Sequence, residues 1–444
     1  MKQTFFKLLS IVLTLSLVFT CCMVAFNATA EETKKTVTYY ISTNTVAGND
    51  GLSSAKPLGS VNAVIAAVGD TCGEGDTVYI KVAADKDTSD KVIPVPWDEN
   101  GNNVIADHDY LLHISSASGS SAIIGDGTAV SFSGDITFSN IKINNPVSGT
   151  NFSLGNGNIR FEKNAAWNSS NKPQFVTSLG AAPTKDFNLY FGIKTISSLV
   201  FGGVYNNLKF GATEADKVTA TVTVDSGAAA DFTFGDRGYS QNGGDHSTTY
   251  NYATFNFDLK TASSFSFSNY GKPYFTSNAA VQIIDSTGNA TITDAAKAYL
   301  AAKTTNDETP APLKYFIIRN PYSFEKDLIQ FTDTVGKFKV NEDPSICEFV
   351  NKDYESIKVT PDADGYVTFI TPGEYVLTVY KEANTTNTYY LSPNGSNAYT
   401  GIESAPFRTL DALIDAAKKA GYKAGDTVYV KVFYVEGKSA PITI

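Results

Sequence analysis

One glycine-rich stretch of the chain brings together several residue types that could do acid–base chemistry. Residues 235–246 contain Asp236, Arg237, Tyr239, Asp245 and His246. A carboxylate or imidazole of suitable pKa can remove a proton from carbon, and a cationic side chain can stabilise the negative charge that develops. If the protein is an enzyme, we expect its catalytic residues to be Arg237, His246, Asp236 and Asp245. The alternative is a solvated turn, because Gly, Asn and Asp are favoured in turns for their backbone geometry.

Aromatic residues in and near this stretch could supply flat surfaces for a sugar. Tyr239 lies within it, Tyr250 follows it, and Trp167 lies in a separate segment rich in Ala, Asn and Ser. Rings with an apolar face and a polar edge are well suited to binding surfaces. Tyr239, Tyr250 and Trp167 are therefore the substrate-binding candidates, and burial in an aromatic core is the alternative for each.

The sequence offers only weak signals for a bound cation. His108 lies between Asp107 and Asp109, and a histidine flanked by acids could titrate near neutral pH or help to bind a metal ion. Residues 97–103 and 362–365 look faintly like calcium loops, but neither has the full ligand spacing with a terminal glutamate. Both are typical of turns. We expect no cofactor and no metal site, with calcium as the one alternative.

The first 30 residues have the features of a secretory signal peptide. Lys2 and Lys7 give a basic start, residues 8–26 form an apolar run, and Ala28 and Ala30 place small residues at a cleavage site. An uncleaved membrane anchor is the alternative, since the run is nearly long enough to span a bilayer. We expect a secreted or cell-surface protein with no membrane span after cleavage.

The chain is acidic and poor in arginine. Its formal charge is −10 at pH 7, and removal of Lys2 and Lys7 with the leader would make it −12. Arginine occurs at only four positions. An acidic protein has no electrostatic attraction to nucleic acid or to an anionic membrane, and scarce arginine argues against phosphate recognition. We therefore expect no nucleic-acid partner, and the expected ligand is an extracellular polysaccharide or surface glycan.

The start of the mature chain is repeated near its end. Three blocks return at a constant offset of 350 residues: 38–42 as 388–392, 51–55 as 401–405, and 75–82 as 425–432. This constant offset predicts a long module followed by the opening of a second copy. Since the second copy reaches Ile444 soon after residues 425–432, we expect the chain to be the front of a longer tandem-repeat protein.

Each copy reads as a strand, a loop rich in Gly, Ser and Asn, a helix and a second strand. In the second copy Thr409 is a suitable N-cap, and Gly421 follows the helix. Apolar residues lie on one face of both helices at helical spacing. They are Leu410, Leu413, Ile414 and Ala417 in the second copy, and Val61, Val64, Ile65 and Val68 in the first.

Residues 110–292 lack helix signals and consist of short aromatic and aliphatic runs separated by Gly, Ser, Asn and Asp. Such runs predict many short strands around a repetitive aromatic core. An antiparallel sandwich and a solenoid of stacked coils are both consistent with this composition. Residues 130–144 read as two short strands around a small polar corner and favour the solenoid. An amphipathic helix could then cover the open end of the solenoid.

The repeated opening resembles the N-terminal cap of right-handed parallel β-helix proteins. The resemblance covers residues 38–82 and 388–432 and is carried above all by the motifs TYYLSPNGS, GIESAPFRTL and GDTVYVKV of the second copy. It points to the pectate-lyase-like superfamily of secreted bacterial proteins. It implies an all-β chain whose residues 38–302 form a right-handed parallel β-helix with an N-terminal capping helix. Members include polysaccharide lyases, other glycan-active enzymes and non-catalytic surface proteins, so the fold does not name the activity.

The region after this module reads as a second domain. A short helix is expected at 293–302 and a linker at 303–312, and the ending of residues 313–383 resembles the last strands of bacterial immunoglobulin-like domains. We therefore expect four parts: a signal peptide (1–30), a β-helix (38–302), a small immunoglobulin-like β-sandwich (313–383) and the cap of a second, truncated β-helix module (387–444). Cys72 and Cys347 fall in different domains, and buried thiols are a simpler interpretation than a disulfide.

Two functions remain open from the sequence. The first is a modular structural or adhesive protein that binds polysaccharide, because tandem copies suit avidity. The second is a polysaccharide lyase or other carbohydrate-active enzyme of the pectate-lyase-like superfamily, which rests on the cap resemblance and the stretch around Arg237. We favour the first, non-catalytic hypothesis, because no complete catalytic set is evident.

Overall fold

The computed structural model describes residues 34–433 apart from short internal gaps. The gaps are residues 102–103, 120, 128–129, 145–151, 155, 169–173, 178–181, 194–197, 204–206, 227–228, 237–246, 261–263, 271, 286–289, 303–312, 321–328, 342–343, 345–346, 380–383, 385, 394, 396, 398 and 404–405.

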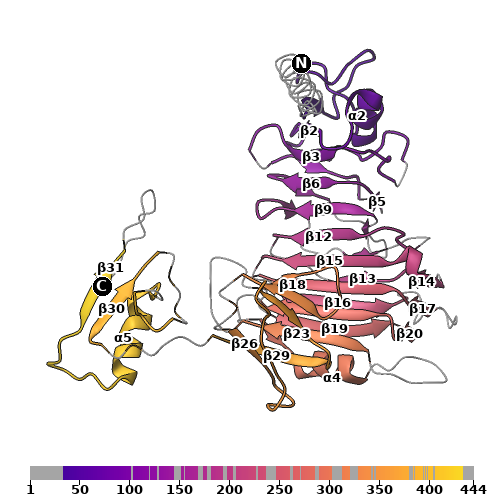
Figure 1. Cartoon of the computed structure of the whole chain (residues 1–444). Helices are drawn as coiled ribbons and strands as arrows, with labels where there is room; N and C mark the ends of the chain where they lie inside the picture. Colours follow the sequence, from indigo (N-terminus) through magenta and orange to yellow (C-terminus); the bar gives the residue numbers. More distant parts are fainter. Residues whose placement is uncertain are drawn as a thin grey trace, which may run out of the picture.

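The described chain is all-β and is dominated by one long, mostly parallel sheet (Figure 1). Its thirteen strands follow the order β1 (Thr36–Ile41), β2 (Thr77–Val82), β3 (Leu111–Ser116), β6 (Ile136–Ser139), β9 (Gly157–Phe161), β12 (Phe187–Phe191), β15 (Val218–Val224), β18 (Ala253–Leu259), β21 (Ala280–Asp285), β23 (Lys314–Arg319), β29 (Gly373–Val379), β26 (Cys347–Asn351) and β27 (Lys358–Val359). Neighbouring strands are parallel from β1 to β29, and β26 is antiparallel to both β29 and β27. The expected all-β class is confirmed.

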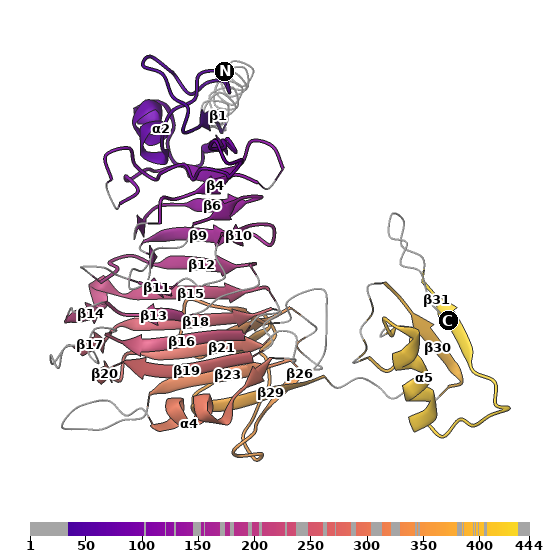
Figure 2. The same cartoon turned by 180° about the vertical axis from the view of Figure 1, so that it is seen from behind.

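Three smaller parallel sheets accompany the long sheet (Figure 2). A seven-stranded sheet has the order β22 (Thr291–Ile292), β19 (Ser264–Tyr270), β16 (Ala229–Gly235), β13 (Ser198–Phe201), β11 (Gln174–Val176), β8 (Phe152–Leu154) and β5 (Ser131–Phe132). Two three-stranded sheets are β10 (Ala166–Trp167), β7 (Lys142–Ile143) and β4 (Ile123–Ile124), and β14 (Leu208–Phe210), β17 (Ser247–Tyr250) and β20 (Lys272–Phe275). The remaining sheets are the antiparallel β24 (Ile329–Phe331), β25 (Lys337–Val340) and β28 (Tyr366–Thr368), and the parallel pair β30 (Thr388–Leu391) and β31 (Tyr429–Val432).

Helices are few and short in the part of the chain that the structure describes. They are α2 (Val61–Val68), α4 (Asp294–Ala302), α5 (Leu410–Lys419) and the 3₁₀ turns η1 (Gly69–Thr71) and η2 (Glu214–Asp216). None of these reaches the length and apolarity that a membrane crossing requires.

The chain visits the parallel sheets in a repeating order. Strand β6 belongs to the long sheet, β7 to a three-stranded sheet and β8 to the seven-stranded sheet, after which β9 returns to the long sheet beside β6. Residues 136–143 form two separate strands, β6 and β7. The division falls at Asn140, whose φ of 49° lies in the left-handed region that asparagine tolerates.

The core of this stack is aromatic and in register. Phe161 pairs with Phe138 on one side and with Phe191 on the other. The ring centroids lie 5.2 and 5.6 Å apart, with interplanar angles of 9° and 12°. All three side chains are fully buried. Each such stacked pair adds about 0.5–1.5 kcal/mol beyond the burial of its apolar area.

Glycine after an inward-facing phenylalanine is explained by close approach of the next turn of chain. A Cβ atom added at Gly202 would lie 1.9 Å from the carbonyl oxygen of Gly235. Gly202 directly follows β13, and Gly235 is the last residue of β16. These two strands pair with each other in the sheet. Gly202, which follows Phe201, therefore lies where two stacked turns almost touch.

The predicted repeat has the same local structure in both copies. The side chain of Ser60 accepts a hydrogen bond from Ala63 N at 3.1 Å at the start of α2, and that of Thr409 accepts from Ala412 N at 3.3 Å at the start of α5. The predicted N-cap at Thr409 is thus confirmed. The backbone agrees as well, since Tyr40 N donates to Gly51 O at 2.7 Å and Tyr390 N donates to Gly401 O at 2.8 Å.

The two copies differ in what covers their second strand. Ile80 and Val82 of β2 are fully buried, because β3 continues the sheet beside them. Their counterparts Val430 and Val432 of β31 are 41% and 54% exposed. The predicted apolar face of α5 is also only partly covered, since Ile414 is 39% exposed.

The C-terminal part of the module shares the long sheet. Strand β23 pairs in parallel with β21 on one side and with β29 on the other. Ile317 faces the core of the parallel stack, whereas Phe316 and Ile318 face a second apolar cluster with Phe338 of β25. The boundary predicted at residue 313 therefore falls inside a continuous sheet. We call residues 329–379, which build the other side of this second cluster, the C-terminal unit.

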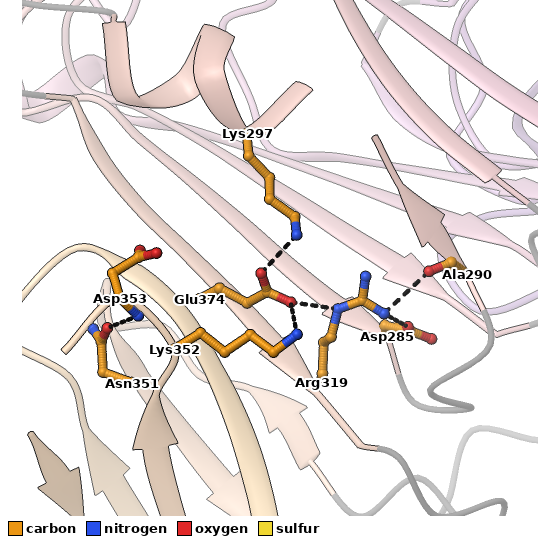
Figure 3. Close-up of polar contacts among 8 residues, drawn as sticks. All are labelled: Asp285, Ala290, Lys297, Arg319, Asn351, Lys352, Asp353 and Glu374. Carbon is orange, nitrogen blue, oxygen red and sulfur yellow. Dashed lines mark hydrogen bonds and ion pairs between the residues drawn. The ribbon is translucent and has the colours of Figure 1, made fainter. Parts of the chain in front are cut away.

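A buried carboxylate joins three elements at this junction (Figure 3). Glu374 of β29 lies 2.8 Å from Lys297 Nζ of α4, 2.6 Å from Arg319 Nε of β23 and 3.7 Å from Lys352 Nζ. The contact with Arg319 is an ion pair without hydrogen-bond alignment. Arg319 Nη1 in turn donates to Asp285 and to the carbonyl oxygen of Ala290, both at 3.1 Å. The net effect lowers the pKa of Glu374: burial raises it, but the hydrogen bond and charge of Lys297 and the charges of Arg319 and Lys352 outweigh burial.

Cys72 and Cys347 are both buried, and they lie in different apolar clusters. No disulfide joins these two described residues.

Candidate binding face of the parallel sheet

The loop that the sequence singles out for catalysis falls largely outside the described residues. Arg237, Tyr239, Asp245 and His246 lie there, and their roles stay predictions. Asp236, the residue that follows β16, is fully buried. Its side chain is therefore not presented to a ligand in this arrangement.

The other two sugar-binding candidates belong to the core or its edge. Tyr250 is 0% exposed, and its ring stacks on Phe275 at 4.8 Å. Its hydroxyl donates to Phe201 O and accepts from Gly235 N. Tyr250 is therefore a core residue, contrary to the expectation of an exposed sugar platform. The reason is alternation, since β17 buries every second residue and Tyr250 is one of these.

Trp167 of β10 is half-buried and packs against the aromatic core. Its ring lies 5.4 Å from Phe161 and 5.7 Å from Phe175. Because the residue is half-buried, it stays partly accessible beside these ring contacts.

The weak cation signals lie in turns. The Nδ1 atom of His108 lies 3.0 Å from the carbonyl oxygen of Ala106, and its ring packs at 5.1 Å from Tyr110. The carboxylate of Asp362 accepts from the backbone N–H groups of Asp364 and Tyr366. Over the described residues no group of three or more His, Cys, Asp or Glu side chains is arranged to hold a metal ion.

The outer face of the long sheet carries a continuous ladder of polar side chains. Strand residues alternate between the core and the outside, and parallel register aligns the outward ones in rows. Asn158 donates to Asp135 at 2.8 Å, and Asn188 donates to Asn158 at 2.6 Å. Farther along the same row Gln282 donates to Asn256 at 2.8 Å. The row as a whole is Asp135, Asn158, Asn188, Thr221, Asn256 and Gln282.

A second row beside the ladder carries aromatic and cationic groups. His113, Thr137, Arg160, Tyr190 and Thr223 are successive partners in the register of β3, β6, β9, β12 and β15. The guanidinium carbon of Arg160 lies 4.1 Å from the centroid of the Tyr190 ring. Arg160 also forms an ion pair with Glu162 at 3.1 Å. A cation held over a ring in this way contributes about 0.5–1 kcal/mol at an exposed site.

Tyr190 is fixed in a neutral, hydrogen-bonding state. Its hydroxyl donates to Asp225 Oδ2 at 2.9 Å, and Lys163 forms an ion pair with the same carboxylate at 3.1 Å. Partial burial, the hydrogen bond to Asp225 and the charge of that carboxylate raise the pKa of Tyr190 well above its usual value. The hydrogen bond to Asp225 therefore holds the ring in place.

Both rows line a pocket with a volume of about 560 Å³, which we call the amide pocket. Its lining residues are Leu111, Asp135, Thr137, Asn158, Arg160, Asn188, Leu189, Tyr190, Thr221 and Thr223. Amides, hydroxyls, one carboxylate, one cation and one aromatic ring thus converge on one hollow across five strands. This is the chemistry with which a protein can bind sugar hydroxyls and an apolar sugar face.

A second hollow, of about 490 Å³, lies on the same face nearer the N-terminus, and we call it the lysine pocket. It is lined by Lys81, His113, Ser115, Ser116, Gly119, Ser139 and Asn140. Lys81 Nζ donates to Ser115 Oγ at 2.9 Å, and His113 Nε2 lies 2.6 Å from Ser139 Oγ. Burial and the nearby charge of Lys81 lower the pKa of His113, while Glu162 opposes this effect.

The C-terminal unit closes the face at one end. Gly336, which precedes β25, donates its N–H to Gln282 Oε1 at 2.8 Å, and Asn256 and Gln282 are only 4% and 1% exposed. The open part of the face therefore runs from β2 to β15. Five inter-strand steps of about 4.8 Å make it about 24 Å long. That length suits an extended ligand lying across the strands.

Sequence reasoning identified the strands of this face but not its rows. The sequence predicts many short strands over residues 110–292, yet nothing in it indicates that Asn188 meets Asn158. The sequence signal for an outward-facing side chain is a polar residue that lies between two apolar, inward-facing residues of a strand. No protein-family model matches the chain, and neither a curated protein nor a solved structure matches it.

Proposed function

We propose that this protein is a secreted or cell-surface module of the parallel β-helix type, whose open sheet face binds an extracellular polysaccharide. The observation that carries the proposal is the amide pocket, where two side-chain rows run across successive parallel strands. A polysaccharide repeats its hydroxyl groups along its length, and the ladder repeats amide and hydroxyl groups along the sheet.

The β-helix interpretation rests on the path of the chain. Strands of the long sheet alternate with strands of the smaller sheets, and each return lies one position farther along. Inward residues of neighbouring turns stack, as Phe138, Phe161 and Phe191 do. Together with the signal-like leader and the repeated opening, this supports an extracytoplasmic structural or adhesive protein. In such a protein, several weak binding sites acting together raise the overall avidity for a polymer.

Tyr190 and Asn188 are the residues on which binding should depend most. Tyr190 offers a ring fixed by Asp225, and Asn188 is an exposed amide that continues the ladder. Loss of one well-placed hydrogen bond in a binding site costs about 0.5–1.5 kcal/mol, or roughly 2- to 13-fold in affinity.

The test is retention of the purified chain on a panel of neutral and acidic polysaccharides. Asn188→Ala and Tyr190→Ala should each weaken retention on the glycan that the wild type binds. Asn168→Ala is the matched control, because Asn168 is also an exposed asparagine with one amide partner, Asn144, but lies after β10 and away from this face. Equal retention of all three variants would reject the amide pocket as the binding site.

A polysaccharide lyase is the second candidate, and one observation favours it. His113, whose pKa is lowered, lies near Lys81 on the same face, which places a neutral base near a cation. The same glycan panel, with and without calcium, should be followed by ultraviolet absorbance of unsaturated sugar ends. Rising absorbance that is lost in His113→Gln would favour the enzyme, and retention without absorbance would favour the binding protein.

A further inference from the structure

The lysine pocket differs from the amide pocket in its charge. Within the described residues, Lys81 contacts the Ser115 hydroxyl and the ring of Tyr79, whose centroid lies 5.7 Å from its Nζ atom. Both are neutral groups. An ammonium group in a hollow, with hydroxyls but no carboxylate partner, leaves its positive charge available to a ligand.

The acidic side chain that acts electrostatically on His113 is already engaged. Glu162 influences His113 electrostatically, but it forms an ion pair with Arg160 at 3.1 Å. Its charge is therefore largely balanced outside the pocket. The remaining lining groups are serine hydroxyls, one asparagine amide and His113. These groups donate hydrogen bonds to oxygen atoms.

We propose that the lysine pocket binds an oxyanion, the carboxylate or sulfate group of a ligand, between Lys81, His113, Ser115 and Ser139, and that this binding strengthens as the pH falls. The site stands on its own residues and does not depend on which sugar occupies the amide pocket.

The pH dependence follows from the groups that face His113. Tyr79 and Lys81 approach it from β2, Ser139 from β6 and Glu162 from the segment after β9. Burial and Lys81 disfavour the imidazolium form. A bound oxyanion adds a negative charge that opposes both effects, so it raises the pKa of His113 in the complex. By reciprocity the protonated protein binds the anion more tightly.

The expected size of the effect is limited by one proton. Affinity should rise by at most about tenfold per pH unit over the range between the pKa of His113 in the free and in the bound protein. Above that range His113 is neutral in both states, and Lys81 alone should hold the anion weakly.

The experiment is a nuclear magnetic resonance titration of the imidazole signals of the full chain. His113 is assigned with His113→Gln, and sodium sulfate, sodium acetate and sodium glucuronate are added at ionic strength matched with sodium chloride. We expect saturable shifts of the His113 signal at pH 5.5, weaker binding at pH 7.5 and a higher pKa of His113 with the anion present. A saturable shift with sulfate alone would identify a sulfated ligand. A saturable shift with glucuronate alone would identify a uronic acid.

Charge variants make the result decisive. Lys81→Gln should abolish the saturable shift, and Lys81→Arg should retain it. Lys86→Gln is the control, because Lys86 is an exposed lysine paired with Asp90 outside the pocket. Unchanged His108 and backbone amide signals in each variant would show that the fold is intact. The proposal is overturned if no anion gives a saturable shift beyond that of chloride, or if the shift persists in Lys81→Gln.

Discussion

Replacing Glu374 by glutamine should destabilise the junction between the long sheet and the C-terminal unit. The Glu374 side chain is 6% exposed and is surrounded by Lys297, Arg319 and Lys352, which are 30%, 17% and 55% exposed. The substitution keeps the size of the side chain and removes its charge. It leaves the cations of three elements without their shared partner.

The magnitude follows from how buried each partner is. Breaking a buried ion pair by removing one partner costs about 3–5 kcal/mol. Solvent screens most of the electrostatic interaction between Lys352 and Glu374, and part of that between Lys297 and Glu374. Arg319 keeps Asp285 at 3.1 Å and is not left alone. We therefore expect a loss of about 2–3 kcal/mol at pH 7, below the full cost of a buried pair.

The pH dependence has a defined sign. The folded-state pKa of Glu374 is lowered from its ordinary value of 4.5. A depressed carboxyl pKa contributes stability above the unfolded pKa, and this contribution is lost as the pH falls through the folded pKa. Wild type and Glu374→Gln should therefore differ most above pH 4.5 and converge as the pH falls below it.

Hydrogen exchange is the appropriate assay, because Trp97 and Trp167 lie in the N-terminal half of the stack and their fluorescence would report on that end. Exchange of peptides from β29 and α4 should quicken in Glu374→Gln, while peptides from β2 and β3 should not change. Glu348→Gln is the control, since Glu348 pairs with a half-exposed Lys358 at 3.0 Å in the same unit. The reasoning would be refuted if Glu374→Gln lost no more stability than Glu348→Gln. It would also be refuted if the loss of stability in Glu374→Gln grew at low pH.

Two further substitutions test the packing of the stack. Phe161→Ala removes the middle ring of a stacked trio and should cost about 3–5 kcal/mol in urea unfolding followed by circular dichroism; a loss under 1 kcal/mol would show that the core collapses around the gap. Gly202→Ala should cost about 1–3 kcal/mol, because the added Cβ meets the carbonyl of Gly235 at 1.9 Å. Gly73→Ala is its control, since nothing lies within 4 Å of that Cβ, and equal losses in the two would refute the close approach.

The features predicted from sequence are those encoded locally. A helix needs an N-cap and apolar residues at helical spacing, and Thr409 with Leu413 supplies both within a few positions. The repeated opening is found because the same backbone contacts require similar residues in both copies. Short strands are found because apolar runs end at Gly, Asn and Ser.

The rows of the candidate binding face could not be predicted, because the turns of the stack differ in length. Asp135 and Asn158 are 23 residues apart, whereas Asn158 and Asn188 are 30 apart. Without a fixed period, an outward residue cannot be assigned its partner on the next strand. The expectation of an exposed ring at Tyr250 is wrong for a related reason. A shift of one residue along a strand moves a side chain from the outer face to the core.

The long sheet continues past the boundary expected at residue 313, because a parallel sheet can be extended by any strand of suitable register. Residues 303–312, rich in Thr, Pro and Ala, read as a linker between independent domains. The strand after them nevertheless pairs with β21 and gives one face to each apolar cluster. A linker-like composition says how the chain is connected, but it does not say whether the sheet stops there.

The shared sheet couples stability to the shape of the candidate binding face. Strand β21 carries both Gln282, which ends the polar ladder by accepting from Gly336, and Asp285, which pairs with Arg319 of the charged junction. Loosening the junction should therefore expose the covered end of the ladder before it affects the amide pocket, which lies farther from β21. If the amide pocket binds a glycan as proposed, Glu374→Gln should retain that binding while its β29 peptides exchange faster. If Glu374→Gln lost glycan retention as well as the protection of its β29 peptides from exchange, the C-terminal unit would be part of the candidate binding site and not only its boundary.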